Sequence, residues 1–397
     1  MLSGNSLFGQ ILQLISRPEF QESVRALKSD RGIKRFSSWD QFVSMLFCQL
    51  AQAKSLREIC YGLRCCLGKL NHLGMKDDPK RSTLSYANKH RSSELFKRIF
   101  YQFLDKCFDI SPGKKKKFRF HNKLLSLDAS IIELCVSIFD WAKFRQTKGA
   151  VKLHLLLDHD GYLPIFVNIT EGRVHEINVA RTLKIPAGSI VAIDRGYHDY
   201  ELFYRWTLDG VWFVTRQKDN AVYEVVEERK VPRNRNILKD QEIRFTGYQS
   251  SRKCPIPLRR IEFFDKEKEE ILVFLTNHMD FGATTIAAIY KDRWEIEIFF
   301  KVIKQNLKIK TFVGTTANAL HIQIWTALIA ILLLKYLKFK SQINWAFSNL
   351  VALIRWNLFT YRNLWEWIDN PFHTPPIITI EQLELPMLDS IKVQGRW

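Results

Sequence analysis

The sequence lacks the cysteine arrangements that bind zinc or build a disulfide framework. Its seven cysteines lie at scattered positions and form no CxxC pair (48, 60, 65, 66, 107, 135 and 254). An odd and scattered set of thiols argues against both kinds of site and fits a reducing cytoplasm. No internal repeat is present either. We therefore expect a cytoplasmic protein without a structural zinc or disulfide core.

Long apolar runs are also missing. The longest, Ile324 to Leu334, is interrupted only by Thr326 and is about half of the roughly 20 residues that a membrane span needs. Polar residues flank the run, so it predicts a buried helix rather than a span. The N-terminus carries no cationic stretch or small-residue cleavage site, which predicts no export.

Acidic residues are few relative to basic ones. The chain has 41 Asp and Glu against 60 Lys and Arg, a net charge of +19. Because 46% of its 397 residues are apolar and 13% aromatic, it is globular and long enough for two or three domains. Such an excess of positive charge predicts a polyanionic partner, with nucleic acid favoured over an anionic membrane surface.

The basic run Lys114–Lys117 follows a Ser-Pro-Gly turn and marks a linker. Before it, the apolar periodicity is helical: the serines at 37–38 cap one helix, a second covers 55–63, and a polar, basic third begins at Ser82. This order resembles a DNA-binding helix-turn-helix region. An ordinary helical bundle with a wet face explains the pattern equally well, and both interpretations remain open.

After the linker the periodicity changes to that of strands. A β-rich stretch over 211–275 follows the first strands, and from Thr284 to Lys310 the pattern is helical again. The first predicted strands are Leu124–Ile132, Lys152–Asp158, Tyr162–Thr170 and Ser189–Asp194.

Two carboxylates end apolar runs in this part of the chain. Asp128 follows Leu-Leu-Ser-Leu, and Asp194 follows Ile-Val-Ala-Ile. Acids at the ends of neighbouring buried strands can share divalent cations in a cleft, and two metals can drive in-line phosphoryl transfer. Each acid taken alone is better explained as a turn or capping residue.

A third segment favours the catalytic interpretation. Tyr290, Arg293, Glu297 and Lys304 fall at about 0°, 300°, 340° and 320° around a helix, a stripe about 60° wide. Apolar residues occupy the adjoining sector. Glu297 could therefore complete a metal site while the cations hold phosphates beside it. The simpler alternative is that Arg293 and Glu297 form an ordinary i,i+4 pair on a wet helix.

These segments together resemble a known family. Asp128-Ala129-Ser130, Asp194-Arg195-Gly196-Tyr197 and the spacing Tyr290-x2-Arg293-x3-Glu297-x6-Lys304 are similar to the DDE transposases of the insertion-sequence-4 family, with its YREK signature. The likeness covers about residues 120 to 340. The helical N-terminus also resembles the leader domain of some members.

The resemblance implies an α/β fold. We expect a ribonuclease-H-like catalytic core, interrupted by a β-rich insertion and preceded by an all-α N-terminal domain. The expected parts are a helical DNA-binding domain (1–115), two core segments (116–210 and 284–340), the insertion (211–283) and a C-terminal helical or dimerisation segment (341–397).

The resemblance also implies an activity. Asp128, Asp194 and Glu297 would be the catalytic metal ligands and hold two Mg²⁺, with Mn²⁺ able to substitute. The enzyme would bind the terminal inverted repeats of an insertion sequence, nick them, pass through a hairpin and join the ends to target DNA. It would act on double-stranded DNA as a homodimer at the nucleoid. The expected DNA contacts are Tyr290, Arg293, Lys304, Arg195 and Lys301.

Two other functions remain open. The protein could be an inactive or domesticated relative that binds DNA without turnover, or a metal-dependent host nuclease of the same fold. The presence of all three acids counts against decay of the active site. The helical stripe counts against a plain nuclease, because hydrolysis alone does not require it.

Overall fold

The computed structural model describes residues 5–66, 69–111, 118–134, 143–145, 148–306 and 313–376. The chain divides into two compact units. Unit 1 comprises Met1–Ile110 and Asn306–Trp397, and unit 2 comprises Ser111–Gln305. The basic run Lys114–Lys117 lies outside the described residues. The domain boundaries expected from the sequence remain predictions.

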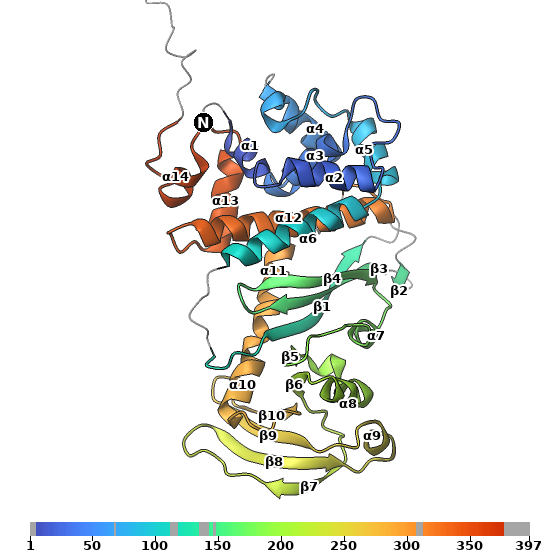
Figure 1. Ribbon diagram of the computed structural model, residues 1–397, viewed down its shortest axis with the longest axis vertical. Helices are drawn as coiled ribbons and strands as arrows, with labels where there is room; N and C mark the ends of the chain where they lie inside the picture. The colour runs from blue at the N-terminus through green and yellow to red at the C-terminus, as the bar shows by residue number, and fades with distance from the viewer. Residues whose placement is uncertain are drawn as a thin grey trace, which may run out of the picture. The chain divides into compact units, whose positions relative to one another are not determined.

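Unit 1 is helical throughout its described residues (Figure 1). The N-terminal part of the chain supplies six α-helices and one short 3₁₀ helix, and the C-terminal part supplies three more α-helices. Their bounds are α1 Leu7–Leu12, α2 Arg17–Ala26, α3 Ser38–Leu50, α4 Leu56–Arg64, η1 Lys69–Leu73, α5 Arg81–His90, α6 Glu94–Ile110, α12 Ala317–Lys340, α13 Phe347–Asn357 and α14 Leu364–Asp369.

Side-chain caps fix where the predicted N-terminal helices begin. Ser37 caps α3 and forms a capping box with Asp40, and Ser55 caps α4 through the backbone N–H of Glu58. These starts confirm the first two predicted helices. The third prediction is confirmed by α5, which begins one residue before Ser82.

The long helix α12 is the centre of unit 1. It packs along α6 and α3, and sixteen of its residues are buried. It is longer than the apolar run in the sequence, and its length and hydropathy alone would let it cross a membrane. Its most apolar stretch is 83% buried within the protein, as in the core helix of a soluble protein. The prediction of a buried helix is confirmed.

Unit 2 contains a mixed sheet of ten strands with helices (Figure 1). The strands are β1 Leu124–Leu134, β2 Lys143–Arg145, β3 Lys148–Asp158, β4 Leu163–Glu171, β5 Ile190–Ile193, β6 Trp212–Arg216, β7 Tyr223–Glu228, β8 Ile237–Phe245, β9 Leu258–Asp265 and β10 Glu270–Thr276. The helices are α7 Glu176–Ala180, η3 Arg195–Tyr197, α8 Tyr200–Leu208, α9 Tyr248–Lys253, α10 Ala283–Asp292 and α11 Trp294–Asn306.

The strand order is β2-β3-β1-β5-β6-β10-β9-β8-β7, with β4 paired to β3. On one side of β1 the strands β3 and β4 form an antiparallel meander. On the other side β5 and β6 run parallel to it. Strand β2 pairs with β3 at that edge of the sheet, and β10, β9, β8 and β7 extend the other side from β6 in antiparallel pairs. The predicted strands Lys152–Asp158 and Tyr162–Thr170 are confirmed as β3 and β4, and the predicted β-rich stretch is confirmed as well.

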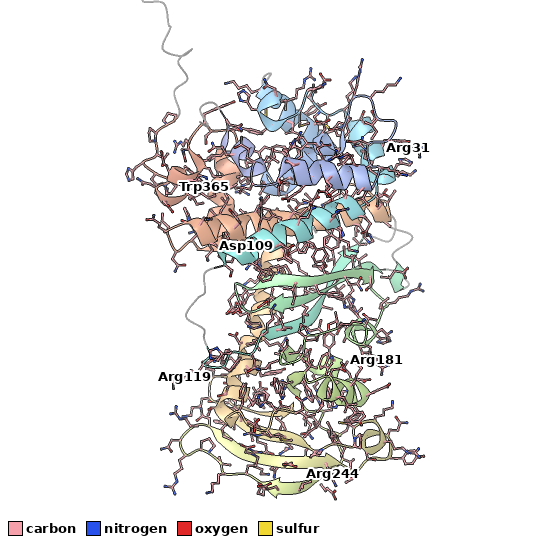
Figure 2. All side chains as sticks on the ribbon, viewed as in Figure 1. Arg31, Asp109, Arg119, Arg181, Arg244 and Trp365 are labelled. Carbon is pink, nitrogen blue, oxygen red and sulfur yellow. The ribbon has the colours of Figure 1, made fainter. Side chains whose placement is uncertain are left out.

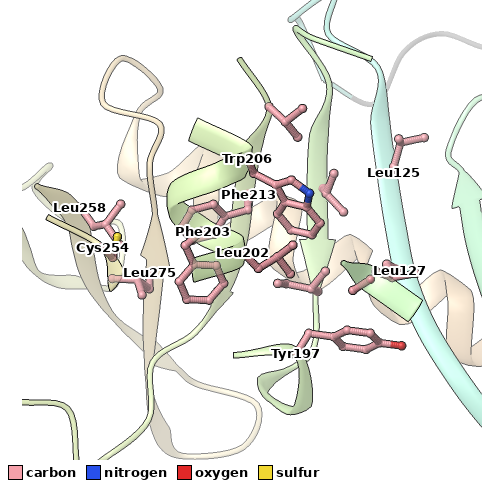
Figure 3. Packing of buried hydrophobic residues seen from close by; sticks show 14 of the residues in the cluster. Leu125, Leu127, Tyr197, Leu202, Phe203, Trp206, Phe213, Cys254, Leu258 and Leu275 are labelled. Carbon is pink, nitrogen blue, oxygen red and sulfur yellow. The ribbon is translucent and has the colours of Figure 1, made fainter. Parts of the chain in front are cut away.

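Alternation along the strands gives the sheet two packed faces. Leu125 and Leu127 of β1 face a cluster that includes Phe203 and Trp206 of α8 (Figure 3). Leu124 belongs to a second cluster, which is packed against α10. The face that carries even-numbered residues of β1 is therefore the face that α10 covers.

The predicted helix from Thr284 to Lys310 is wrong in one respect, since it is not continuous. It breaks between α10 and α11 at Arg293, whose backbone N–H is shared between the carbonyls of Ile289 and Tyr290 at 3.3 and 3.2 Å. The N–H of Ile296 then bonds back to the carbonyl of Arg293, three residues earlier. Arg293 itself keeps right-handed helical dihedrals (φ −52°, ψ −29°), so a single tightened turn joins the two helices. The last residues of the predicted helix, 307–310, lie outside the described part.

Candidate active site

The pairing of β1 with β5 brings two of the predicted acids together. Leu127 lies opposite Ile193 in this parallel pair, so the next residues, Asp128 and Asp194, are also neighbours. Adjacent strands are about 4.8 Å apart. Both acids lie on the α10 face, because each follows a residue of the opposite cluster. The sequence predicted this proximity, and the register supplies its cause.

Arg293, at the break between α10 and α11, connects the strands with the third acid. Its Nη2 lies 2.8 Å from Oε1 of Glu297, and its Nη1 lies 3.7 Å from Oδ2 of Asp128. The residue is only 8% exposed. Burial works to lower the pKa of Arg293, but the phenol of Tyr290 and the surrounding carboxylates together raise it. A buried and permanently charged guanidinium thus gathers two of the three predicted acids.

Asp128 has an unusual electrostatic environment. Burial, with smaller contributions from the nearby carboxylates of Asp194 and Glu176, raises the pKa of this carboxyl to about 7. The backbone N–H of Ala129, 2.7 Å from Oδ1, and the charge of Arg293 only partly offset these effects. A strong shift in a cluster of acids is typical of functional sites.

One residue near the acids, Glu176, was missed by the sequence reasoning, and Tyr197 entered it only as part of the Asp194–Tyr197 motif. A Cβ on Gly196 would lie 3.3 Å from Oε2 of Glu176 and 3.9 Å from Oδ2 of Asp194, so both carboxylates border this glycine. Glu176 is also paired with Lys152 at 3.3 Å. Tyr197 is fully buried, and its hydroxyl has no hydrogen-bond partner within the described structure. No spacing in the sequence marks Glu176, because the fold alone brings α7 to this point.

The residues expected to bind DNA lie on α10, on α11 and directly after β5. Tyr290 lies under the guanidinium of Arg293, 5.4 Å from it, and also packs against Phe274. Arg195 is bound to Asp219 at 2.6 Å near the acids. Lys301 is exposed on α11, and Lys304 lies one turn beyond it. The predicted stripe is thus carried by two helices, α10 and α11, that join at Arg293.

The donor set fits a hard divalent cation. Carboxylate oxygens are the ligands that Mg²⁺ and Mn²⁺ prefer, and the site supplies them from a strand pair and a helix. Among the residues that the structure describes, no three acid, histidine or cysteine side chains already stand close enough to hold an ion. Glu297 contacts Arg293 instead. The acids therefore match the chemistry of a divalent-cation site, while Arg293 pairs with Glu297, the expected third ligand.

Fold and site together define an α/β protein with a carboxylate centre at the junction of two parallel strands and a broken helix. Comparison with protein families agrees with this class. The transposase DDE domain matches residues 120–333, and a domain of unknown function, DUF4372, matches residues 3–76. The chain belongs to the DDE transposase family.

Individual relatives are transposases of bacteria. A Sinorhizobium fredii transposase is 32% identical over 228 residues, which cover 56% of this chain and 64% of the relative. The chain thus spans just under two thirds of that protein. A transposase for insertion sequence element IS5377 of Geobacillus stearothermophilus is 30% identical over 271 residues, 67% of this chain and 70% of the relative.

One solved structure has a partial likeness to the chain. It is a piggyBac transposase in a synaptic complex with hairpin DNA, with 11% identity and a TM-score of 0.42, over 96% of this chain and 81% of that one. A score of this size carries no argument about fold.

Proposed function

We propose that the protein is the transposase of an insertion sequence of the insertion-sequence-4 type and uses Asp128, Asp194 and Glu297 as its catalytic carboxylates. The observation that carries the proposal is the convergence of these acids. Two are neighbours in the β1–β5 register, and Arg293 contacts Asp128 from the strands and Glu297 from the helix. An ordinary i,i+4 pair on a wet helix does not explain a buried arginine that also reaches a strand carboxylate.

Two Mg²⁺ ions, held by Asp128, Asp194 and Glu297, would activate the attacking water or 3′-hydroxyl and stabilise the leaving oxygen. The protein's own groups contribute positioning and charge. Arg293 and Lys304 bring cations to the phosphate beside the acids, and Tyr290 supports the guanidinium of Arg293 from below. Lys301 and Arg195 extend this positive surface along the DNA. Tyr197 is fully buried close to Asp128 and Asp194.

We further propose that the core is ribonuclease-H-like. Its support is the central strand β1, flanked by the β3–β4 meander on one side and by the parallel strands β5 and β6 on the other. Strands β7 to β10 would then be the expected insertion, which enters the same sheet through β6. The finer steps of the reaction, a hairpin intermediate and a homodimer at the nucleoid, belong to the same proposal.

The N-terminal helices supply a surface suited to DNA. The N-terminal end of α4 and one face of α5 along its whole length border an open cavity of about 1020 Å³. Basic side chains, serines and the stacked rings of Tyr86 and His90, 4.0 Å apart, form its wall, and the residues that line it include no acid. Exposed arginines occur elsewhere in both units, among them Arg31, Arg181 and Arg244 (Figure 2), so charge alone does not single out this surface. The concentration of cations in a hollow does.

Removal of cations from this cavity should weaken DNA binding by a salt-dependent amount. We expect Arg57→Ala/Lys89→Ala to lower duplex affinity about tenfold or more at low salt and to reduce the slope of log K against log salt by about 2, since each lost phosphate contact removes about one counterion. Fluorescence anisotropy at several salt concentrations measures both quantities. The control is Arg25→Ala/Arg31→Ala, which removes two exposed arginines of unit 1 outside the cavity. Equal losses in both double variants would contradict a DNA site here.

The proposal as a whole is tested with labelled duplexes from the gene's own flanks. Purified wild type, Glu297→Gln and Glu295→Gln are incubated with and without Mg²⁺, and the products are separated on a denaturing gel. We expect nicks and a hairpin at one defined position, only with metal, for wild type and for Glu295→Gln. Binding without cleavage in Mg²⁺ or Mn²⁺ would instead make the protein an inactive DNA-binding relative.

A further inference from the structure

A chain of buried hydrogen bonds connects β1 with the end of α10. The hydroxyl of Ser126 lies 2.7 Å from Nε2 of His159, and Nδ1 of the same ring lies 2.6 Å from Oδ2 of Asp292. Ser126 is fully buried, and the side chains of His159 and Asp292 are 7% and 2% exposed. The three residues come from a strand, a β-turn and a helix, far apart in sequence.

The proton positions in this chain follow from the chemistry of its ends. An ionised carboxylate can only accept, so Nδ1 of His159 donates to Asp292. In the neutral ring Nε2 is then the acceptor, and the hydroxyl of Ser126 donates to it. The backbone N–H of His159 donates to the carbonyl of Leu124 at 3.0 Å, which ties the turn to β1 a second time. The imidazole is thus held from both β1 and α10.

This arrangement resembles a nucleophilic triad in its connectivity, but it cannot act as one. Ser126 has no exposed surface and lies within the packed sheet, so no substrate reaches its hydroxyl. Asp292 is also costly where it stands. It is buried at the end of α10, and removing an ionised carboxylate from water is unfavourable. Because burial of this acid is unfavourable, we looked to its position in the fold for a role beyond pairing with His159.

The position of the chain of bonds indicates that role. Ser126 precedes Asp128 by two residues on the same face of β1, and Asp292 directly precedes Arg293, where the helix breaks. The hydrogen bonds therefore connect β1, which carries Asp128, to the turn between α10 and α11, which lies just before Glu297. Asp128 and Arg293 form a second cross-link beside the first, at 3.7 Å.

We propose that Ser126, His159 and Asp292 form a positioning relay that sets the direction of α11 and hence the separation of Glu297 from Asp128. The inference rests on the proposed function of the three acids. Without His159, the hydrogen-bonded connection between β1 and the end of α10 is lost, and Glu297 is held less firmly near the strand carboxylates. The relay acts through the acids and does not touch the reacting atoms.

The test combines Mn²⁺ affinity in the absence of DNA, cleavage kinetics and conservative rescue. We expect His159→Ala to weaken Mn²⁺ binding and to lower the cleavage kcat by about 10–100-fold, as for other residues that orient metal ligands, with KM for DNA changed less than about twofold. His159→Asn keeps a donor toward Asp292 and should recover part of both losses. Asp292→Asn, which keeps the shape but removes the charge, provides a second variant if His159→Ala does not fold.

The control is His121→Ala, at an exposed histidine just before β1. Folded His159→Ala and Asp292→Asn variants with wild-type Mn²⁺ affinity would overturn the relay, as would equal recovery by His159→Asn and a second His159→Leu variant. If wild type cuts no DNA but its Mn²⁺ affinity still depends on His159, the proposed function fails and the relay stands. Loss of DNA affinity in parallel with kcat would indicate general unfolding and would also overturn it.

Discussion

Replacement of any one of Asp128, Asp194 and Glu297 by its amide is expected to lower metal-dependent cleavage at least about 10³-fold, which corresponds to roughly 4 kcal/mol of transition-state stabilisation. An amide keeps the shape of the side chain but loses the charge that attracts a divalent cation. Each variant should also bind Mn²⁺ more weakly. Single-turnover cleavage and Mn²⁺ titration by paramagnetic resonance measure the two effects.

DNA binding should persist in these variants, because the basic side chains that contact phosphates are unchanged. The matched control is Glu295→Gln on the same helix. Glu295 lies two residues from Glu297, about 200° away around the helix, so the two side chains leave α11 on different sides. If Glu295→Gln loses as much activity as Glu297→Gln, the assignment of the third acid is wrong. If Asp194→Asn retains cleavage, the paired-strand site itself is wrong.

The second large effect concerns stability in the absence of divalent cations. Burial raises the pKa of Asp128 to about 7, well above the value of about 3.9 for an exposed aspartate. The protonated acid is therefore favoured in the folded protein. Its contribution to stability is complete below about pH 4 and is lost as the pH rises through 7. At pH 8 the folded protein carries a buried charge that it does not accommodate well.

Asp128→Asn should remove this cost. With a chelator present, we expect the variant to melt on the order of 5 °C higher than wild type at pH 8 and to differ little at pH 4.5. Differential scanning fluorimetry across this range tests the prediction. Mn²⁺ should narrow the gap by stabilising wild type alone. A variant that is less stable than wild type at pH 8 would show that Arg293 compensates the charge of Asp128 fully.

The two predictions together describe a trade between stability and function at one residue. The same substitution is expected to abolish cleavage and to stabilise the protein. At functional sites a buried charged group often lowers the stability of the protein, and contacts elsewhere in the fold compensate for this loss. Residues that merely support the structure do not behave in this way, so the combination separates a catalytic from a structural role for Asp128.

Much of unit 2 was predictable because local patterns determine it. Alternation identified β1, β3, β4 and β5, and apolar runs that end in acids identified Asp128 and Asp194. Their closeness follows once β1 and β5 are parallel, since an in-register pair must place successive residues side by side. The caps Ser37 and Ser55 fixed the starts of α3 and α4 in the same local way.

Features that depend on packing between distant segments were not predictable. The break at Arg293 does not follow from periodicity, because Ala283 to Asn306 is apolar at helical spacing throughout. At this point Arg293 contacts two acids, one of them on a distant strand. Glu176 and His159 reach the site only through the positions of α7 and the β3–β4 turn. A side chain that reaches the site only through tertiary contacts produces no recognisable motif spacing in the sequence.

The most direct test of the central claim is a strand-transfer reaction. A short duplex from the gene's flank, with a free 3′-hydroxyl at the mapped cleavage position, is incubated with wild type, Mg²⁺ and a supercoiled target plasmid. A transposase is predicted to join that 3′-end covalently to the plasmid, and Glu297→Gln is predicted not to. Degradation or nicking of the plasmid at many positions, with no joined product, would contradict the account and identify a metal-dependent nuclease instead.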